Sequence, residues 1–281
     1  MIQLMLPALV ASLILVGIHG YLGIHIIARG VIFVDLALAQ VAALGWAAAA
    51  LGLGQWLASV TGLPANEASY IIGLATTLVA AALFSLTRME HARVPQEAII
   101  GIVYVVASAA TILVAAQSPM GTENVEHLLT GTLLWVTWPA ILKTAIVYGT
   151  LGVVHWLLRK RFLTISLHPE EAAAKGWKVA GWDFLFYGLF GVVVTSSVAI
   201  AGVLLVFSFL VIPAVIAFFF ADTPGPLLAI AWITGTLATV VGLVVSYVSD
   251  LPTGPVVVCA FAAALLIAFI VRGVARRPAP A

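Results

Sequence analysis

The chain has 281 residues, of which 63% are hydrophobic and only 8% charged, and its formal net charge is +1. Soluble domains contain about 25% charged residues, so this composition excludes an ordinary soluble enzyme and a disordered chain. The near-neutral charge also excludes a nucleic-acid-binding protein, which would need a basic surface.

The apolar residues form long continuous runs. A membrane-spanning helix takes about 20 such residues, and continuous rather than alternating runs favour helices over a β-barrel. We therefore predict an all-α, polytopic helical membrane bundle of eight to nine transmembrane segments. Frequent Ala and Gly residues would let the helix backbones approach closely in lipid. The segments cover about 2–28, 31–57, 69–87, 98–116, 138–158, 182–198, 202–221, 227–247 and 256–272.

The boundary between the sixth and seventh segments allows two interpretations. The residues 198–202 include Gly202 and no charge. They predict either a turn between two spans or a break within the membrane. If the two segments form one broken element, the number of spans falls from nine to eight.

Basic residues mark alternate loops. The loops 58–68, 117–137 and 248–255 contain neither Lys nor Arg. By the positive-inside rule the loops that carry the basic residues are cytoplasmic. The C-terminus is then inside and, with nine spans, the N-terminus outside. The basic residues concerned are Arg29, Arg88, Arg93, Arg159, Lys160, Arg161, Lys175, Lys178, Arg272, Arg276 and Arg277.

The largest predicted cytoplasmic loop, 159–181, contains a short helix. Pro169 suits the first helical position, Glu170 and Glu171 suit the positive N-terminal end of the helix dipole, and Gly176 suits its termination. An exposed helix on the cytoplasmic face of a mostly apolar protein is most simply a docking element for a partner.

The sequence contains no Walker lysine motif, no glycine-rich phosphate loop after a strand and no soluble nucleotide domain. If ATP powers this protein, its binding site therefore lies on another chain. A His-Glu-x-x-His motif, paired aspartates in spans and a Gly-x-Ser-x-Gly motif are also missing from the sequence, so we do not expect an enzyme.

Asp35 is the only acidic residue within an N-terminal apolar run. An ionisable group inside a span is a functional candidate by default, although Asp35 could instead pair with Arg29 or sit at a helix end. Gln40 could contribute to the same site or make a helix–helix hydrogen bond. His19 and His25 could be core histidines that bond backbone carbonyls. A histidine near Asp35 could also provide a nitrogen ligand for a metal.

The predicted outer loops hold three further candidates. Glu123 and His127 are four residues apart and would share one face of a helix, where they could receive a metal or dock a binding protein. A solvated loop is the alternative. Asp250 lies in a Pro- and Gly-rich turn. We interpret it primarily as a turn-forming residue and secondarily as part of a gate.

Three stretches, taken together, resemble the membrane permease of ABC importers for zinc, manganese or iron. In 29–45, an arginine and an apolar run precede Asp35, similar to the family's Gly-Asp-Ala-Leu-Ser-His region. Glu171-Ala172-Ala173 with Gly176 resembles the Glu-Ala-Ala…Gly loop with which importer permeases dock their ATPase. The stretches 202–214 and 246–255 resemble strings in the family's C-terminal half. The stretches 97–102 and 128–131 match more weakly.

One departure concerns the presumed metal site. The family places Asp and His four residues apart on one helix face, whereas here Ala39 follows Asp35 at that spacing and Gln40 comes one residue later. Five residues turn a regular helix by about 140° net, and a π-bulge would be needed to bring Asp35 and Gln40 together. A neutral amide oxygen also favours a harder ion than Zn²⁺.

The resemblance implies a type II-like ABC importer permease, with 1–281 as a single transmembrane domain in the cell membrane. It implies a homodimer that moves a divalent metal ion between its copies, with no resident cofactor. The partners would be a cytoplasmic ATP-binding subunit and an extracytoplasmic metal-binding protein. A permease for a metal chelate and a secondary transporter driven by an ion gradient are the alternatives. The implied metal path consists of Asp35, Gln40 and His25, and the implied ATPase contact consists of Glu170, Glu171, Ala172, Ala173 and Gly176.

Overall fold

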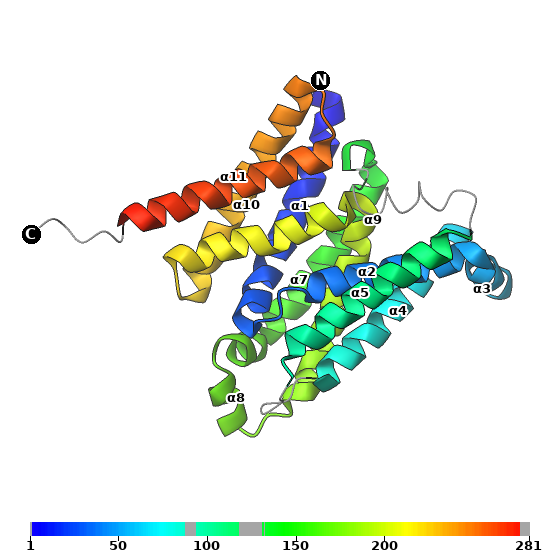
Figure 1. Cartoon of the computed structure of the whole chain (residues 1–281), viewed down its shortest axis with the longest axis horizontal. Helices are drawn as coiled ribbons and strands as arrows, with labels where there is room; N and C mark the ends of the chain where they lie inside the picture. Colours follow the sequence, from blue (N-terminus) through cyan, green and yellow to red (C-terminus); the bar gives the residue numbers. More distant parts are fainter. Residues whose placement is uncertain (1, 88–93, 118–130, 132, 276–281) are drawn as a thin grey trace, which may run out of the picture. The chain divides into compact units, whose positions relative to one another are not determined.

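The computed structural model describes residues 2–87, 94–117, 131 and 133–275, and within these ranges every regular element is a helix. Eight helical stretches are long and apolar enough to cross a membrane, which confirms the predicted polytopic bundle. The elements in chain order are α1 (Ile2–Arg29), α2 (Val34–Ala48), the π-helical η1 (Ala49–Leu53), α3 (Gly54–Thr61), α4 (Ala65–Thr87), α5 (Gln96–Ala115), the 3₁₀ turn η2 (Leu133–Trp135), α7 (Trp138–Leu167), α8 (Pro169–Ala174), α9 (Val179–Phe220), α10 (Pro224–Ser249) and α11 (Thr253–Ala275) (Figure 1).

Helix α9 contains the boundary that the sequence left open between the sixth and seventh apolar segments. The helix has 42 residues. Unbroken, it would be about 63 Å long, twice the thickness of a bilayer core. Gly202 interrupts it with φ 75° and ψ 161°, a conformation open to glycine because glycine has no Cβ. The break thus falls within the predicted interval, and helix continues on both sides of it.

The second predicted span, 31–57, consists of three consecutive helical elements. Regular α-helix in α2 gives way to the π-helical η1, and α3 continues to Thr61. Gly52, inside η1, has a φ of 118°. A local change of helix type at a glycine is a common way to bend a long helix without ending it.

Helix α7 is longer than its predicted span of 138–158, because it continues to Leu167. The extension includes Arg159, Lys160 and Arg161. Lys and Arg have high helix propensity, so the helix does not end where its hydropathy falls. It carries the chain to the start of the short helix α8.

The chain forms two compact units, each made of separate stretches. The first unit contains Met1–Ala28, Thr132–Gly152 and Leu204–Ala281, and the second contains Arg29–Gly131 and Val153–Val203. Both α7 and α9 therefore contribute to each unit. Arg29, the last residue of α1, is the first residue of the second unit.

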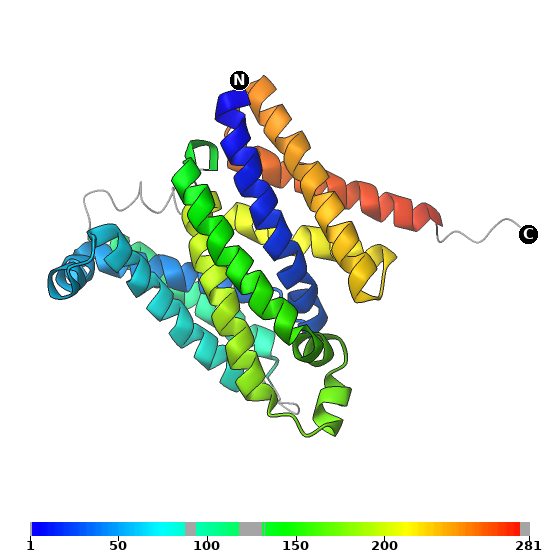
Figure 2. The same cartoon turned by 180° about the vertical axis from the view of Figure 1, so that it is seen from behind.

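Small residues permit close helix packing within each unit, as the composition predicted. In the second unit, α2 lies beside α4 and α5 (Figures 1 and 2), and a Cβ on Gly45 would lie 2.7 Å from the Cα of Gly73. In the first unit, α10 packs on α11, and a Cβ on Gly242 would lie 2.7 Å from the Cα of Val257. These contacts are possible because lipid-embedded helices associate through close packing rather than apolar burial.

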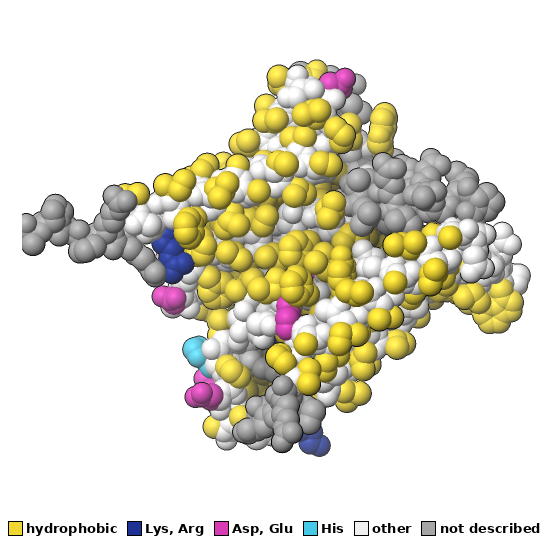
Figure 3. Space-filling view, in the orientation of Figure 1, with side chains coloured by type: hydrophobic (Ala, Val, Ile, Leu, Met, Phe, Trp, Pro, Cys, Tyr) yellow, Lys and Arg dark blue, Asp and Glu magenta, His cyan; other side chains and the backbone are white. Residues whose placement is uncertain are grey.

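Large apolar side chains cover much of the surface. Val79 is 73% exposed, Leu113 69% and Phe269 66%. The face shown in Figure 3 is largely hydrophobic, with charged side chains confined to a few places. A surface of this kind is stable against lipid rather than water, so the chain is a multi-pass membrane protein.

Candidate functional site

Asp35 lies in the first turn of α2 and is 1% exposed. Its helix packs against α4 and α5 of the same unit. Among the described residues, no donor makes a hydrogen bond to the buried Oδ1 of Asp35. The positive N-terminal end of the helix dipole is the one favourable feature that α2 itself offers a carboxylate here.

Gln40 lies on the same helix as Asp35 and is 8% exposed. Helix α2 is regular from Val34 to Ala48, and the π-helical turn begins only at Ala49. The two side chains therefore point about 140° apart around the helix axis. The π-bulge that would bring them onto one face is not at this place, so one copy of α2 does not direct both side chains at a single ion.

Arg29 is engaged by Asp183 instead of Asp35. Its Nη1 donates to Asp183 Oδ1 at 2.6 Å, and its Nε donates to Ser166 Oγ at 2.8 Å. The side chains of this ion pair are 1% and 0% exposed. The guanidinium carbon also lies 4.0 Å from the centre of the Phe186 ring. The end of α1 is thereby fixed to α7 and α9 within the second unit.

Glu97 holds the segment that leads into α2. It lies in the first turn of α5, and its Oε1 accepts a hydrogen bond from the backbone N–H of Phe33 at 2.9 Å. Phe33 is the residue before α2 and offers no side-chain cap of its own. A carboxylate from another helix thus satisfies a free amide at the start of α2, next to Asp35 in the sequence.

The histidines of α1 belong to the first unit. His19 is fully buried, its Nδ1 lies 2.8 Å from the backbone oxygen of Leu15, and its ring meets Tyr148 edge to face. This is the core histidine that the sequence offered as one interpretation. His25 is 1% exposed and packs edge to face on Tyr21, with ring centres 4.7 Å apart. Its place on a metal path stays a prediction.

Helix α8 has the ends that the sequence predicted. Pro169 occupies its start, and Gly176 follows it with φ 66°. The N–H of Gly176 donates to Ala173 O at 2.9 Å and that of Trp177 to Ala172 O at 3.2 Å. This pair of bonds is a Schellman motif, which terminates helices at a left-handed glycine.

One face of α8 is anchored and the rest is exposed. Ala172 is buried, whereas Glu170, Glu171 and Ala173 are exposed. Lys175 forms an ion pair with Glu171 one turn away. A six-residue helix has little stability alone, so packing of Ala172 and the turn after it hold α8 in place. The exposed face remains available to a partner.

Cationic and aromatic contacts connect the end of α8 with the buried ion pair. Arg161 lies 4.9 Å from the ring centre of Trp177 and 4.8 Å from that of Trp182. Trp182 contacts Phe162 edge to face at 6.1 Å, and Phe162 contacts Phe186 in the same way at 5.6 Å. Phe186 is the ring beneath the buried guanidinium. Every step of this series lies within the second unit.

The outer-loop candidates divide into two groups. Glu123 and His127 lie outside the described residues. Asp250 is exposed and follows α10 with φ 52° and ψ 39°. Ser246 Oγ donates to Leu251 O at 2.8 Å across the same turn. This geometry matches the turn-forming interpretation of Asp250.

In the part of the chain that the structure describes, no three His, Cys, Asp or Glu side chains lie close enough together to hold a metal ion. Metals usually take four or more ligands from such groups, backbone oxygens or water. A metal ion held by these described residues would therefore need ligands besides these four side-chain types, such as backbone or amide oxygens or water.

Two further buried ionisable residues, Asp183 and His155, were not predicted from the sequence as site residues. Asp183 is the one acidic residue of the sixth apolar segment, and that isolation could have marked it. His155 is 1% exposed and its ring lies 4.9 Å from Phe162 and 5.8 Å from Phe186. Its predicted span also contains Lys143, so no comparable isolation marked His155.

Comparison with known proteins gives one family. The model of the ABC 3 transport family matches residues 1–272. The chain is 26% identical over 266 residues to a probable iron transport system membrane protein of Haemophilus influenzae, covering 95% of this chain and 89% of that protein. It is 25% identical over 217 residues to a manganese transport system membrane protein of Synechocystis, covering 77% and 69%.

The fold is also found among solved structures. PsaBC from Streptococcus pneumoniae, solved in complex with a Fab, superimposes with a TM-score of 0.77. The sequences are 23% identical, and the alignment covers 95% of this chain and 92% of that one. The likeness therefore shows a shared helical architecture across almost the whole chain.

Proposed function

The chain belongs to the ABC 3 transport family and is a multi-pass membrane permease subunit of an ABC transporter, and we propose that its cargo is a divalent metal ion, namely manganese, iron or zinc. It acts as a single permease domain that imports the ion with energy from ATP. The chain itself catalyses no bond chemistry, because ATP is bound and hydrolysed by a partner subunit. Membership in this family argues against a secondary transporter driven by an ion gradient.

The observation that supports a cationic cargo is that the Asp35 carboxylate is buried and that no described donor bonds its Oδ1. A carboxylate inside a span is costly, by about 2.5–3.5 kcal/mol on insertion scales. The nearest arginine in the sequence is already bound to Asp183, and no described donor bonds Asp35 Oδ1. A passing cation would compensate this charge in a low-dielectric surrounding. The names of the iron and manganese transport relatives support the same class of cargo.

A homodimer would complete the path. In one copy, Asp35 and Gln40 lie on different sides of α2. The described residues of that copy contain no cluster of three His, Cys, Asp or Glu side chains. Asp35 is 1% exposed within one copy, so a helix movement during transport would have to uncover it. A twofold axis near the start of α2 would then bring two Asp35 carboxylates to one ion, since a symmetric interface repeats each side chain. Two carboxylates balance the charge of a divalent ion. Gln40 points about 140° away from Asp35 around α2, so Gln40 and His25 would be neutral contacts at other points of the path and not ligands of this ion.

ATP hydrolysis would reach this path through α8. Its exposed face, including Glu170, Glu171 and Ala173, docks on the ATP-binding subunit. The aromatic series behind α8 ends at Arg29, five residues before the start of α2. When the ATP-binding subunit displaces α8, these packed side chains would move Arg29. The segment between α1 and α2, which positions Asp35, would then move with it. An extracytoplasmic metal-binding protein would deliver the ion on the opposite side.

Uptake by reconstituted complexes tests the cargo and Asp35 together. Asp35→Asn keeps the shape of the side chain and removes its charge, and we expect uptake of the transported ion to fall about 100-fold, which corresponds to about 2.7 kcal/mol. Asp222→Asn, the same change on an exposed turn, serves as the matched control and should transport normally. Assembly and melting temperature should be retained in both. Normal uptake by Asp35→Asn would remove this residue from the path.

The same vesicles distinguish a free ion from a chelate. Uptake is measured with ⁵⁴Mn²⁺, ⁵⁵Fe²⁺ and ⁶⁵Zn²⁺, and with each ion bound to excess chelator. We expect transport of at least one free ion that the chelator abolishes. Transport only in the presence of chelator would identify a chelate permease. Native mass spectrometry of the active complex should find two permease copies, and one copy would overturn the homodimer.

Docking is tested by changes confined to α8. Glu171→Arg with Gly176→Arg places bulky cations on the exposed face and at the terminating glycine. We expect the ATPase to separate from the permease and ATP hydrolysis to lose its dependence on transport. Lys178→Gln, just beyond this turn, is the control. A double variant that purifies with its ATPase and turns over normally would show that α8 is not the docking helix.

A further inference from the structure

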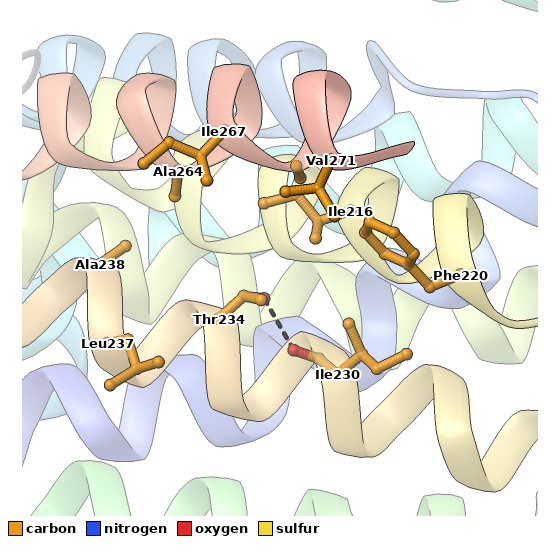
Figure 4. A pocket seen from close by; sticks show the side chains of 10 residues that line it. Ile216, Phe220, Ile230, Thr234, Leu237, Ala238, Ala264, Ile267 and Val271 are labelled. Carbon is orange, nitrogen blue, oxygen red and sulfur yellow. Dashed lines mark hydrogen bonds between the residues drawn. The ribbon is translucent and has the colours of Figure 1, made fainter. Parts of the chain in front are cut away.

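An apolar groove lies in the first unit among the second part of α9, α10 and α11. It has a volume of about 330 Å³. Its walls include Phe220 of α9, Leu237 of α10 and Ile267 of α11 (Figure 4). Leu237 is 60% exposed and Ile267 is 62% exposed, so the groove opens outward. All three helices are candidate membrane spans.

The ten side chains that line the groove offer no free hydrogen-bond donor to an occupant. Thr234 is the one polar side chain among the ten that line it. Its hydroxyl donates to the backbone oxygen of Ile230 at 2.7 Å, within its own helix (Figure 4). Only a hydrocarbon chain would fill such a slot without leaving its own polar groups unpaired.

A cation lies next to the groove on α11. Arg272 follows Ala268, which lines the groove, by four residues, so it lies one turn further along the same face of α11. Its guanidinium carbon lies 4.7 Å from the ring centre of Phe219. Phe219 is adjacent to Phe220 of the groove wall. The Nε of Arg272 is buried, and among the described residues no acceptor bonds it and no carboxylate forms an ion pair with it.

The combination selects an amphipathic anion. A guanidinium binds phosphate with two parallel hydrogen bonds, and basic pockets between spans at the cytoplasmic side receive lipid head groups. Arg272 is on the cytoplasmic side by the distribution of basic residues. We propose that the groove and Arg272 form a binding site for an anionic phospholipid, with an acyl chain between α9, α10 and α11 and the phosphate on the guanidinium.

One nearby charge, the carboxylate of Asp222, opposes the binding of an anion at this site. Asp222 follows Phe220 by two residues, and its side chain is exposed. An exposed carboxylate is screened by water and salt, whereas Arg272 Nε is shielded from solvent. The arginine therefore dominates the electrostatic preference at this site.

Lipid retention by the purified full-length chain in detergent tests the site. The chain is incubated with phosphatidylglycerol or with phosphatidylcholine of the same acyl chains, and bound lipid is counted by native mass spectrometry. We expect phosphatidylglycerol to be retained in preference. Arg272→Gln should lower its retention about fivefold, and Arg272→Lys should restore part of it.

The groove itself is tested by filling it. Ala264→Phe places a ring in the slot and should displace the lipid, while Ala263→Phe on the neighbouring exposed position should not. This pair remains informative even if a change of Arg272 impairs folding. Unchanged phosphatidylglycerol retention in Ala264→Phe, or equal retention of both lipids by the wild type, would overturn the proposal. Loss of a dimer in Ala264→Phe alone would instead identify the groove as an interface between two copies.

Discussion

The two units of the chain differ in whether they bury charged side chains. In the second unit, the side chains of Arg29, Asp35 and Asp183 are each at most 1% exposed. Among the described residues of the first unit, the buried polar side chains are hydroxyls and histidines such as Ser12, His19 and Thr239. Arg272, a cation of the first unit, lies instead one turn beyond Ala268 on the face of α11 that lines an open groove.

This difference separates two ways of holding helices together in a membrane. Burial of apolar side chains provides little driving force for helix association in lipid. The first unit relies on close backbone approach at small residues, for example Gly23 and Gly242. The second unit adds a buried ion pair whose partners are 154 residues apart in the sequence. Breaking a buried ion pair costs much stability. This pair lies where the aromatic series from α8 reaches Arg29, just before the segment that leads into α2.

The ion pair should give the largest stability effect. Asp183→Ala leaves the buried Arg29 guanidinium without its partner, and we expect a loss of about 3–5 kcal/mol. In the first unit, Arg272→Gln breaks no ion pair and should cost less than about 1 kcal/mol. Chemical unfolding in detergent measures both. Equal losses would remove the contrast between the units. Arg29→Gln combined with Asp183→Asn should recover part of the loss, because no charge is then left unpaired.

Close packing in the first unit should give the next effect. A Cβ on Gly23 would lie 2.0 Å from the backbone oxygen of Leu210, which cannot rotate away. Gly23→Ala should therefore destabilise the protein by about 1–3 kcal/mol. Gly17 lies on the same helix with nothing within 4 Å of its added Cβ, so Gly17→Ala should be neutral or stabilising. Melting temperatures that move together in the two variants would contradict the packing argument.

A smaller and local effect is expected at the end of α8. Gly176 has a φ of 66°, and a residue with a side chain costs about 1–2 kcal/mol in the left-handed region. Gly176→Val should loosen α8 while leaving the spans folded. Hydrogen exchange should quicken at 169–177 only. Gly181→Ala, at a position without positive φ and with nothing within 4 Å, is the control. Faster exchange throughout the second unit would mean that α8 is not a separate local element.

The smallest effect concerns the exposed ion pair on α8. A hydrogen bond from Lys175, together with its charge, lowers the pKa of Glu171. Because the pKa is depressed, the pair stabilises α8 above the ordinary pKa of a glutamate, and this contribution is lost as the pH falls through the lowered value. Lys175→Gln should raise the pKa of Glu171, measured by NMR titration of the labelled carboxyl. High salt should produce part of the same shift. A pKa unaffected by the substitution would show that the pair does not persist in solution.

Much of the architecture could be predicted because its signals are local. Hydropathy runs located the spans, and the glycine at 202 located the break in α9. The capping residues of α8 predicted both of its ends, since Pro at the start and Gly after the end act within one turn. Where prediction fell short, as at the end of α7, the hydropathy signal stopped before the helix did.

The candidate site was less predictable. Its residue types identified Asp35 as unusual, and the regular geometry of α2 agrees with the expected separation from Gln40. The partner of Arg29 was not predictable, because Asp35 stands six residues away in the sequence and Asp183 stands far along the chain. Nearness in sequence suggested the wrong carboxylate.

The sequence by itself determined that this protein is a helical membrane bundle with a capped cytoplasmic helix and one isolated carboxylate near the start of its second span. Each of these properties depends on residues within a turn or a single span. Only the tertiary structure decided that Arg29 pairs with Asp183, that aromatic rings connect this pair with α8, and that an apolar groove lies among α9, α10 and α11. Such contacts depend on which helices pack together, and a run of Ala, Gly and Val residues permits many packings while specifying none.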